Sequence, residues 1–143
     1  MQHGSGLATS GEVTGVIDRS LLAKEIGHSS LSDLHITESL AERKLLMAEL
    51  SAGFIALPGG FGTLDELFEV LVFDQLHGHD KPIALLHVDG YWDLLLAFLD
   101  HAVTEQLLSP VNRELVLVGA DIDDLLTRMR AIELPTAPTW LDR

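Results

Sequence analysis

The residues best suited to chemistry lie in one stretch, Phe54-Ile55-Ala56-Leu57-Pro58-Gly59-Gly60-Phe61-Gly62-Thr63-Leu64-Asp65-Glu66. An apolar strand leads into three glycines, which lead in turn into the acidic start of a helix. We expect the glycines to take positive φ and bring the backbone close to a ligand. The amides of Gly62, Thr63 and Leu64 would then point at an anion from the helix N-terminus. The stretch therefore predicts a phosphate-binding loop beside a carboxylate.

The same turn also has a purely architectural interpretation. Thr63 is a suitable N-cap residue, and Glu66 follows three residues later, so the pair fits a capping box. Pro58 stiffens the exit from the strand. A strand, a glycine turn and a capped helix can be joined without binding anything, so the local pattern leaves this alternative open.

Two other sequence features bear on the site. The segments from Glu38 to Lys44 and from Pro58 to Glu66 each follow directly on a predicted strand, so both should lie at the carboxyl edge of a parallel sheet, where ligands bind. The basic pair Arg43-Lys44 would bring positive charge to that edge. The alternative for Arg43 is an ion pair with Glu42 or Glu38 on the helix surface.

The run His77-Gly78-His79-Asp80 offers two imidazoles in a polar turn. Without a third well-spaced ligand, we predict a solvated loop here and no metal site.

Composition limits the classes of function. The chain has 143 residues, of which 47% are hydrophobic, and this suits one folded domain. The formal charge of −13 argues against binding polymeric nucleic acid, because that affinity comes largely from Lys and Arg. Zero cysteines exclude thiol nucleophiles and fit a cytoplasmic protein. No apolar run reaches the roughly 20 residues of a membrane span, and no signal peptide is recognisable, so we expect no membrane association.

Strand-like and helix-like runs alternate along the chain. We predict strands at Glu12–Ile17, Leu34–Thr37, Gly53–Leu57, Pro82–Val88 and Glu114–Val118, and helices at Glu38–Leu50, Thr63–His77, Tyr91–Gln106 and Asp121–Ile132. This alternation predicts an α/β fold, a Rossmann-like doubly wound parallel sheet with helices on both faces. We expect residues 1–143 to form a single domain whose ends, 1–11 and 134–143, are loosely held.

The run Pro58 to Glu66 resembles the PGGxGTxxE signature of the LOG ("Lonely guy") family of cytokinin riboside 5′-monophosphate phosphoribohydrolases, once mislabelled as lysine decarboxylases. Glu38 to Met47 resembles the family's ESMHERKxxM helix, although Leu40 and Ala41 replace its Met and His. Further similarity lies in three downstream segments, Gln75-Leu76, His79 to Pro82 and Val88 to Tyr91.

Family members carry a first βαβ unit with a YGGGxxGLMG segment, to which only His3 to Leu7 is similar here. The resemblance therefore implies a chain that is N-terminally truncated relative to the family, lacking strands between those at Glu12–Ile17 and Leu34–Thr37. Three possibilities follow: the two strands pair directly, another chain fills the space, or the product is a compromised fragment.

The resemblance implies hydrolysis of the N-glycosidic bond of adenosine 5′-monophosphate or its N6-substituted forms, giving free base and ribose 5-phosphate. It implies a homodimer and no metal or organic cofactor. Such a bond breaks through an oxocarbenium-like transition state, which a carboxylate stabilises. By resemblance, Glu66 and Arg43 are the catalytic pair, and the substrate is held by Lys44, Gly59, Gly60, Phe61, Gly62, Thr63 and Glu69. The alternative is a nucleotide-binding or structural subunit that has lost catalysis.

Overall fold

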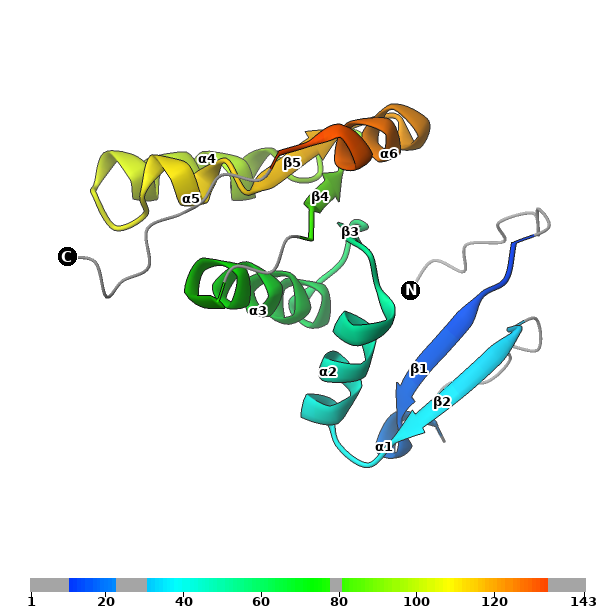
Figure 1. Cartoon of the computed structure of the whole chain (residues 1–143). Coiled ribbons are helices and arrows are strands. Elements are labelled where there is room, and N and C mark those ends of the chain that lie inside the picture. The colour runs from blue at the N-terminus through cyan, green and yellow to red at the C-terminus, as the bar shows by residue number, and fades with distance from the viewer. Residues whose placement is uncertain (1–10, 23–30, 78–80, 134–143) are drawn as a thin grey trace. The chain divides into compact units, whose positions relative to one another are not determined.

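The computed structural model describes residues 11–22, 31–77 and 81–133 (Figure 1). The chain divides into two compact units, Met1–Leu50 and Ser51–Arg143, and each is described by itself. The expected loose ends at residues 1–10 and 134–143 lie outside the described residues. That the two units form a single domain stays a prediction.

Unit 1 is built on two parallel strands. Strand β1 (Thr14–Asp18) is followed by the short helix α1 (Arg19–Leu22), and strand β2 (Asp33–Thr37) by helix α2 (Leu40–Leu50). The strands pair directly along five residues, from Thr14 opposite Asp33 to Asp18 opposite Thr37. The first of the three possibilities, direct pairing of the two strands, is therefore confirmed.

Local hydrogen bonds explain where α2 begins. The Ser39 hydroxyl accepts from the amide of Glu42 at 3.1 Å, and the Glu42 carboxylate accepts from the amide of Glu38 at 2.9 Å. The first helical hydrogen bond runs from the Arg43 amide to the Ser39 carbonyl. Ser39 and Glu42 thus act much as a capping box, and they start the helix at Leu40, two residues later than predicted.

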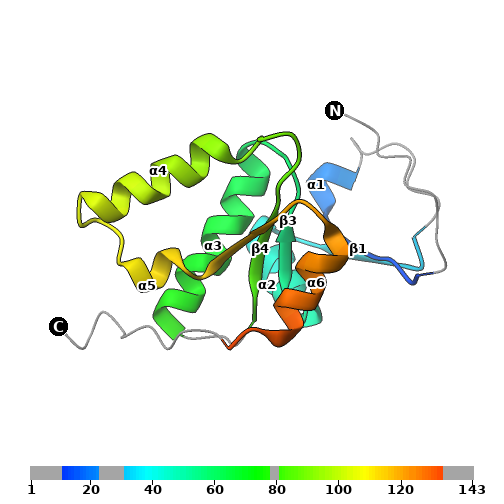
Figure 2. The same cartoon turned by 90° about the horizontal axis from the view of Figure 1, so that it is seen from above.

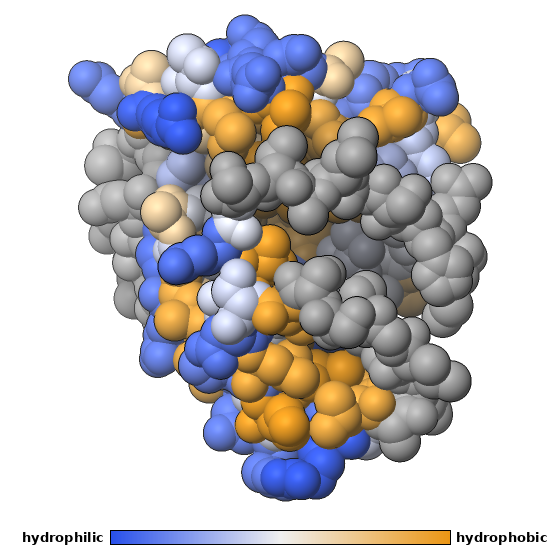
Figure 3. Space-filling model, turned by 90° about the vertical axis from the view of Figure 1, so that its right-hand side faces the viewer, coloured by the Kyte–Doolittle hydropathy of each residue, from blue (hydrophilic) through white to orange (hydrophobic). Residues whose placement is uncertain are grey.

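One surface of the two-stranded sheet is apolar. Leu34 and Ile36 alternate with His35 and Thr37 along β2. The exposed fraction is 42% for Leu34 and 43% for Ile36. Figure 3 shows apolar side chains gathered in the lower part of that view, at the height of β2 in Figure 1.

Unit 2 is a three-stranded parallel sheet with the strand order β3-β4-β5. In Figure 2, strands β3 and β4 lie between α3 and α6. Its elements are β3 (Phe54–Ala56), α3 (Phe61–His77), β4 (Ile83–Leu86), α4 (Asp93–Thr104), α5 (Pro110–Arg113), β5 (Val116–Gly119) and α6 (Ile122–Ala131). Every strand and helix predicted from the sequence of this unit is present, with bounds that differ by at most two residues.

Alternate residues of the central strand β4 face two separate cores. Ile83 and Leu85 pack with Leu67 of α3 and with Trp92 at the start of α4. Ala84 packs on the other face, against Leu125 and Met129 of α6. Helices therefore cover both faces of this sheet, as the α/β prediction required. Among the described residues, no helix combines the length and apolarity needed to cross a bilayer.

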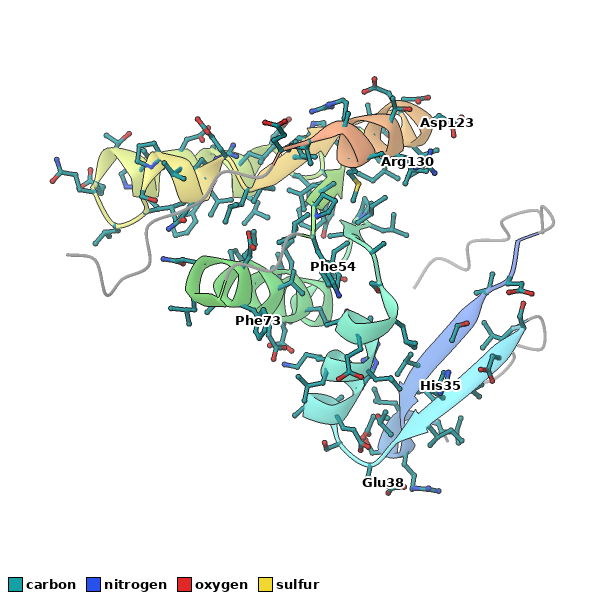
Figure 4. All side chains as sticks on the ribbon, viewed as in Figure 1. His35, Glu38, Phe54, Phe73, Asp123 and Arg130 are labelled. Atoms are coloured by element: carbon teal, nitrogen blue, oxygen red, sulfur yellow. The ribbon has the colours of Figure 1, made fainter. Side chains whose placement is uncertain are left out.

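An ion pair joins the ends of β1 and β2 in unit 1. Both carboxylate oxygens of Glu38 accept from the Arg19 guanidinium, with Nε at 2.9 and 3.0 Å and Nη2 at 2.6 Å. Glu38 lies where β2 passes into α2 (Figure 4). These hydrogen bonds from Arg19, together with its charge, hold the pKa of the Glu38 carboxyl below its usual value.

We predict that Arg19→Gln returns the pKa of Glu38 to its usual value, measured by NMR titration of the side-chain carboxyl carbon. Because the folded-state pKa is lowered, the pair stabilises the fold above the unfolded-state pKa of Glu38 and loses that effect as the pH falls through the folded-state pKa. The difference in thermal midpoint between wild type and Arg19→Gln should therefore shrink on acidification. The control is Arg113→Gln, which breaks the exposed pair of Arg113 with Asp100 in unit 2 and should leave the pKa of Glu38 unchanged. A Glu38 pKa that is equal in wild type and Arg19→Gln contradicts the prediction.

Candidate active site

The glycine loop joins the carboxyl end of β3 to the N-terminus of α3. The amide of Leu64 donates to the carbonyl of Gly60 at 3.1 Å, which makes Gly60 the N-cap residue of α3. The predicted start at Thr63 is therefore two residues late. Thr63 is the third helical residue and Glu66 the sixth, so the predicted capping box between them is wrong. Glycine is itself an acceptable N-cap, and this lets the helix begin directly after it.

Because α3 begins earlier than predicted, the amides that could face an anion also differ from those predicted. In any α-helix the first three amides after the N-cap have no acceptor within the helix. Here these are the amides of Phe61, Gly62 and Thr63, whereas the Leu64 amide is bonded to Gly60. The helix amides that could face an anion therefore begin one residue earlier than predicted.

The loop glycines serve a purpose other than the expected positive φ. Among the described glycines only Gly90 has a positive φ, so that expectation for Gly59, Gly60 and Gly62 is wrong. A Cβ at Gly59 would lie 2.8 Å from the Cβ of Thr63, so glycine allows the loop to pack against the first turn of α3. At Gly60 and Gly62 no described atom lies within 4 Å of an added Cβ. These two positions leave space in which a ligand can approach the backbone.

Glu66 lies on the same side of α3 as this space. Residues four apart share a helix face, so Gly62 and Glu66 are neighbours, and Glu69 continues that face. Helical side chains lean toward the helix N-terminus, so we expect the Glu66 carboxylate to lie toward Gly62. Glu66 is half-buried and Glu69 is exposed. The nearby Phe61 has an exposed fraction of 94%. An acid and a set of amides without acceptors inside the helix thus occupy the N-terminal part of α3.

The basic pair belongs to unit 1. Arg43 is the fourth residue of α2, and its Nε donates to the carbonyl of Val16 in β1 at 3.1 Å. Arg43 and Lys44 are both half-buried. Of the two partners proposed for Arg43, Glu38 is paired with Arg19, and Glu42 accepts from the amide of Glu38. Because the glycine loop belongs to unit 2, the meeting of Arg43 with that loop stays a prediction.

Sequence reasoning did not assign a function to Tyr91. Its hydroxyl donates to the carbonyl of Gly59 at 2.5 Å, across 32 positions of sequence. The preceding Asp89-Gly90 pair is a turn signal that indicates a sharp reversal after β4. No sequence signal indicates the partner of the hydroxyl.

In the described part of the chain, no group of three or more His, Asp or Glu side chains could hold a metal ion. Residues 78–80 of the histidine run lie outside the described residues.

Comparison with known proteins identifies relatives along most of the chain. A family model described as "Possible lysine decarboxylase" matches residues 1–129. A "Probable cytokinin riboside 5'-monophosphate phosphoribohydrolase" of Oryza sativa subsp. japonica is 44% identical over 127 residues, 89% of this chain and 50% of the relative. An Arabidopsis thaliana protein named cytokinin riboside 5'-monophosphate phosphoribohydrolase is 41% identical over 82% of this chain and 54% of its own length. One of that name from Rhodococcoides fascians is 41% identical over 89% of this chain and 65% of its own length.

The chain thus spans between half and two thirds of the length of these relatives. The family model and the names of the relatives agree with the family that the motifs resemble. The chain belongs to the family described as possible lysine decarboxylases, which is the LOG family that its motifs resemble.

Proposed function

We propose that the chain hydrolyses the N-glycosidic bond of adenosine 5′-monophosphate or its N6-substituted forms, releasing the base and ribose 5-phosphate. The observation that carries this proposal is the first part of α3, where the half-buried Glu66 shares a helix face with the open position Gly62. An anion bound by the first-turn amides would lie close to this carboxylate. The names of the relatives support the same substrate class.

In the proposed mechanism the loop holds the 5′-phosphate and Glu66 acts on the sugar. As the bond to the base breaks, positive charge develops on the ribose, and the Glu66 carboxylate stabilises it and orients the attacking water. Arg43 keeps its protons at neutral pH, so it contributes charge to the phosphate or the departing base and does not act as an acid. The proposed binding residues are Lys44, Gly59, Gly60, Phe61, Gly62, Thr63 and Glu69. The reaction needs no metal or organic cofactor.

We also propose a two-fold homodimer that uses helical surface. On α4, Leu94 and Phe98 lie one turn apart with exposed fractions of 86% and 61%, while Leu99 of the same helix is buried. A second copy would remove such side chains from water. For the location we propose the cytoplasm, because a chain without cysteine suits a reducing compartment.

We predict that Gly60→Val abolishes measurable binding of adenosine 5′-monophosphate in calorimetric titration. The valine side chain would fill the space through which the phosphate reaches the backbone. The thermal midpoint should fall modestly, because valine is a poorer N-cap than glycine, although no described atom lies within 4 Å of the new Cβ. Gly59→Ala makes the useful contrast, because its Cβ would collide with Thr63 and lower the midpoint. Equal nucleotide affinity in wild type and Gly60→Val refutes the proposed phosphate site.

For catalysis we predict that Glu66→Gln lowers turnover by about a hundredfold or more, because an amide stabilises an oxocarbenium charge poorly. Nucleotide affinity should largely persist. The measurement is chromatographic release of base from adenosine 5′-monophosphate. The matched control is Asp65→Asn, which removes the neighbouring exposed carboxylate from a different helix face and should keep most activity. In Arg43→Ala both binding and turnover should weaken. Unchanged base release in Glu66→Gln would sink the mechanism.

For assembly we predict that sedimentation of the wild type gives a two-chain mass and that Phe98→Glu gives a one-chain mass, because a charge at the interface is costly to bury. The control is Ile122→Glu on α6, which packs on the opposite face of the sheet, and it should remain dimeric. A monomeric wild type, or a dimer that survives Phe98→Glu, contradicts the proposed interface.

A further inference from the structure

The chain reverses sharply after β4, between Val88 and Tyr91. The amide of Tyr91 donates to the carbonyl of Val88 at 2.9 Å, and the two central residues, Asp89 and Gly90, have φ values of 49° and 73°. Two positive φ values in succession are the mark of a type I′ turn, for which Asp-Gly is a preferred pair. A Cβ at Gly90 would also lie 2.7 Å from a carboxylate oxygen of Asp93. The positive φ favours glycine at this position, and a larger residue would also have to displace the Asp93 carboxylate.

The turn is held firmly on both sides. Before it, the amide of His87 donates to the carbonyl of Gly119 at 2.8 Å, and the His87 Nε2 lies 3.1 Å from the Asp93 carboxylate. After it, Trp92 is almost fully buried and its indole N–H donates to the carbonyl of Leu86 at 3.1 Å. The ring of Tyr91 packs edge-on against Trp92, with centroids 4.9 Å apart. The tyrosine ring therefore extends from a rigid base.

From this base the Tyr91 hydroxyl reaches the glycine loop, where it donates to the Gly59 carbonyl at 2.5 Å. Gly59 also packs against Thr63 in the first turn of α3, with no room for a Cβ between them. The residue is thus held on its carbonyl side by Tyr91 and on its Cα side by Thr63.

Holding this carbonyl fixes the next amide. In a trans peptide the C=O and the following N–H point in opposite directions, and the described peptides include no cis bond. The hydroxyl of Tyr91 therefore sets the direction of the Gly60 N–H as well. Without it, a peptide between two glycines could rotate at little steric cost and turn a carbonyl toward an incoming anion.

We infer that Tyr91 is a positioning residue for the phosphate loop, whose hydroxyl locks the Gly59-Gly60 peptide so that the Gly60 amide, and not a carbonyl, faces the ligand. The inference rests on the proposed function for the identity of the ligand, a phosphate monoester. Tyr91 touches no reacting atom and acts through Gly59 alone.

The test is Tyr91→Phe, which keeps the ring on Trp92 and removes only the hydroxyl. By calorimetry, the dissociation constants for inorganic phosphate and adenosine 5′-monophosphate should rise roughly fivefold, the value of one hydrogen bond. The dissociation constant for adenosine, which lacks the phosphate, should not change. As a direct readout, the Gly60 amide should become more mobile in the variant, measured by its heteronuclear ¹H–¹⁵N NOE.

The matched control is Thr127→Val, which removes a hydroxyl that donates to the Asp123 carbonyl at 2.9 Å in α6. All three affinities should be unchanged in that variant. Equal phosphate affinity in wild type and Tyr91→Phe overturns the inference, and so does a parallel loss of adenosine affinity, which would indicate general distortion. A wild type that binds phosphate more tightly than Tyr91→Phe but releases no base supports the inference and contradicts only the proposed function.

Discussion

Burial of strand β4 on both faces is the constraint on which unit 2 depends. Ile83, Ala84 and Leu85 are 1%, 0% and 0% exposed, and β3 and β5 pair with this strand in parallel. Parallel pairing brings the carboxyl ends of neighbouring strands to one edge of the sheet. The glycine loop leaves β3 at this edge and the Asp89-Gly90 turn leaves β4 there. This is why a tyrosine can support a loop 32 positions earlier in the sequence.

A chain of formal charge −13 needs local hydrogen-bond donors in order to bind an anion, and the carboxyl edge of the unit 2 sheet offers them. The first turn of α3 offers hydrogen-bond donors without a net charge, and Gly60 and Gly62 leave the approach open. In unit 1 the Nε of Arg43 is anchored on the Val16 carbonyl, which limits where its guanidinium can lie. In the proposed mechanism the main-chain amides and glycines of the loop bind the phosphate, and the Glu66 carboxylate acts on the sugar.

Much of the fold could be predicted because its signals are local. The alternation of apolar runs located all five strands of the described residues. Asp121 caps α6 by accepting from the amide of Asp124. The short helix α5 was missed, although Ser109 as N-cap and Pro110 as first residue are a helix-start signal. The start of α3 was misplaced because Thr63 is the better N-cap by residue type, whereas the loop geometry selects Gly60. The hydrogen bond from the Tyr91 hydroxyl to the Gly59 carbonyl could not be predicted, since it depends on the register of β3 and β4.

The central claim is that a phosphate held by the α3 N-terminus makes the N-glycosidic bond available to Glu66. The most direct measurement is the rate of base release by the wild-type chain from adenosine 5′-monophosphate and from adenosine at equal concentrations. The account predicts release from the monophosphate and little or none from adenosine, because only the monophosphate carries the group that the first-turn amides bind. Equal release from both compounds, or none from the monophosphate, would contradict it.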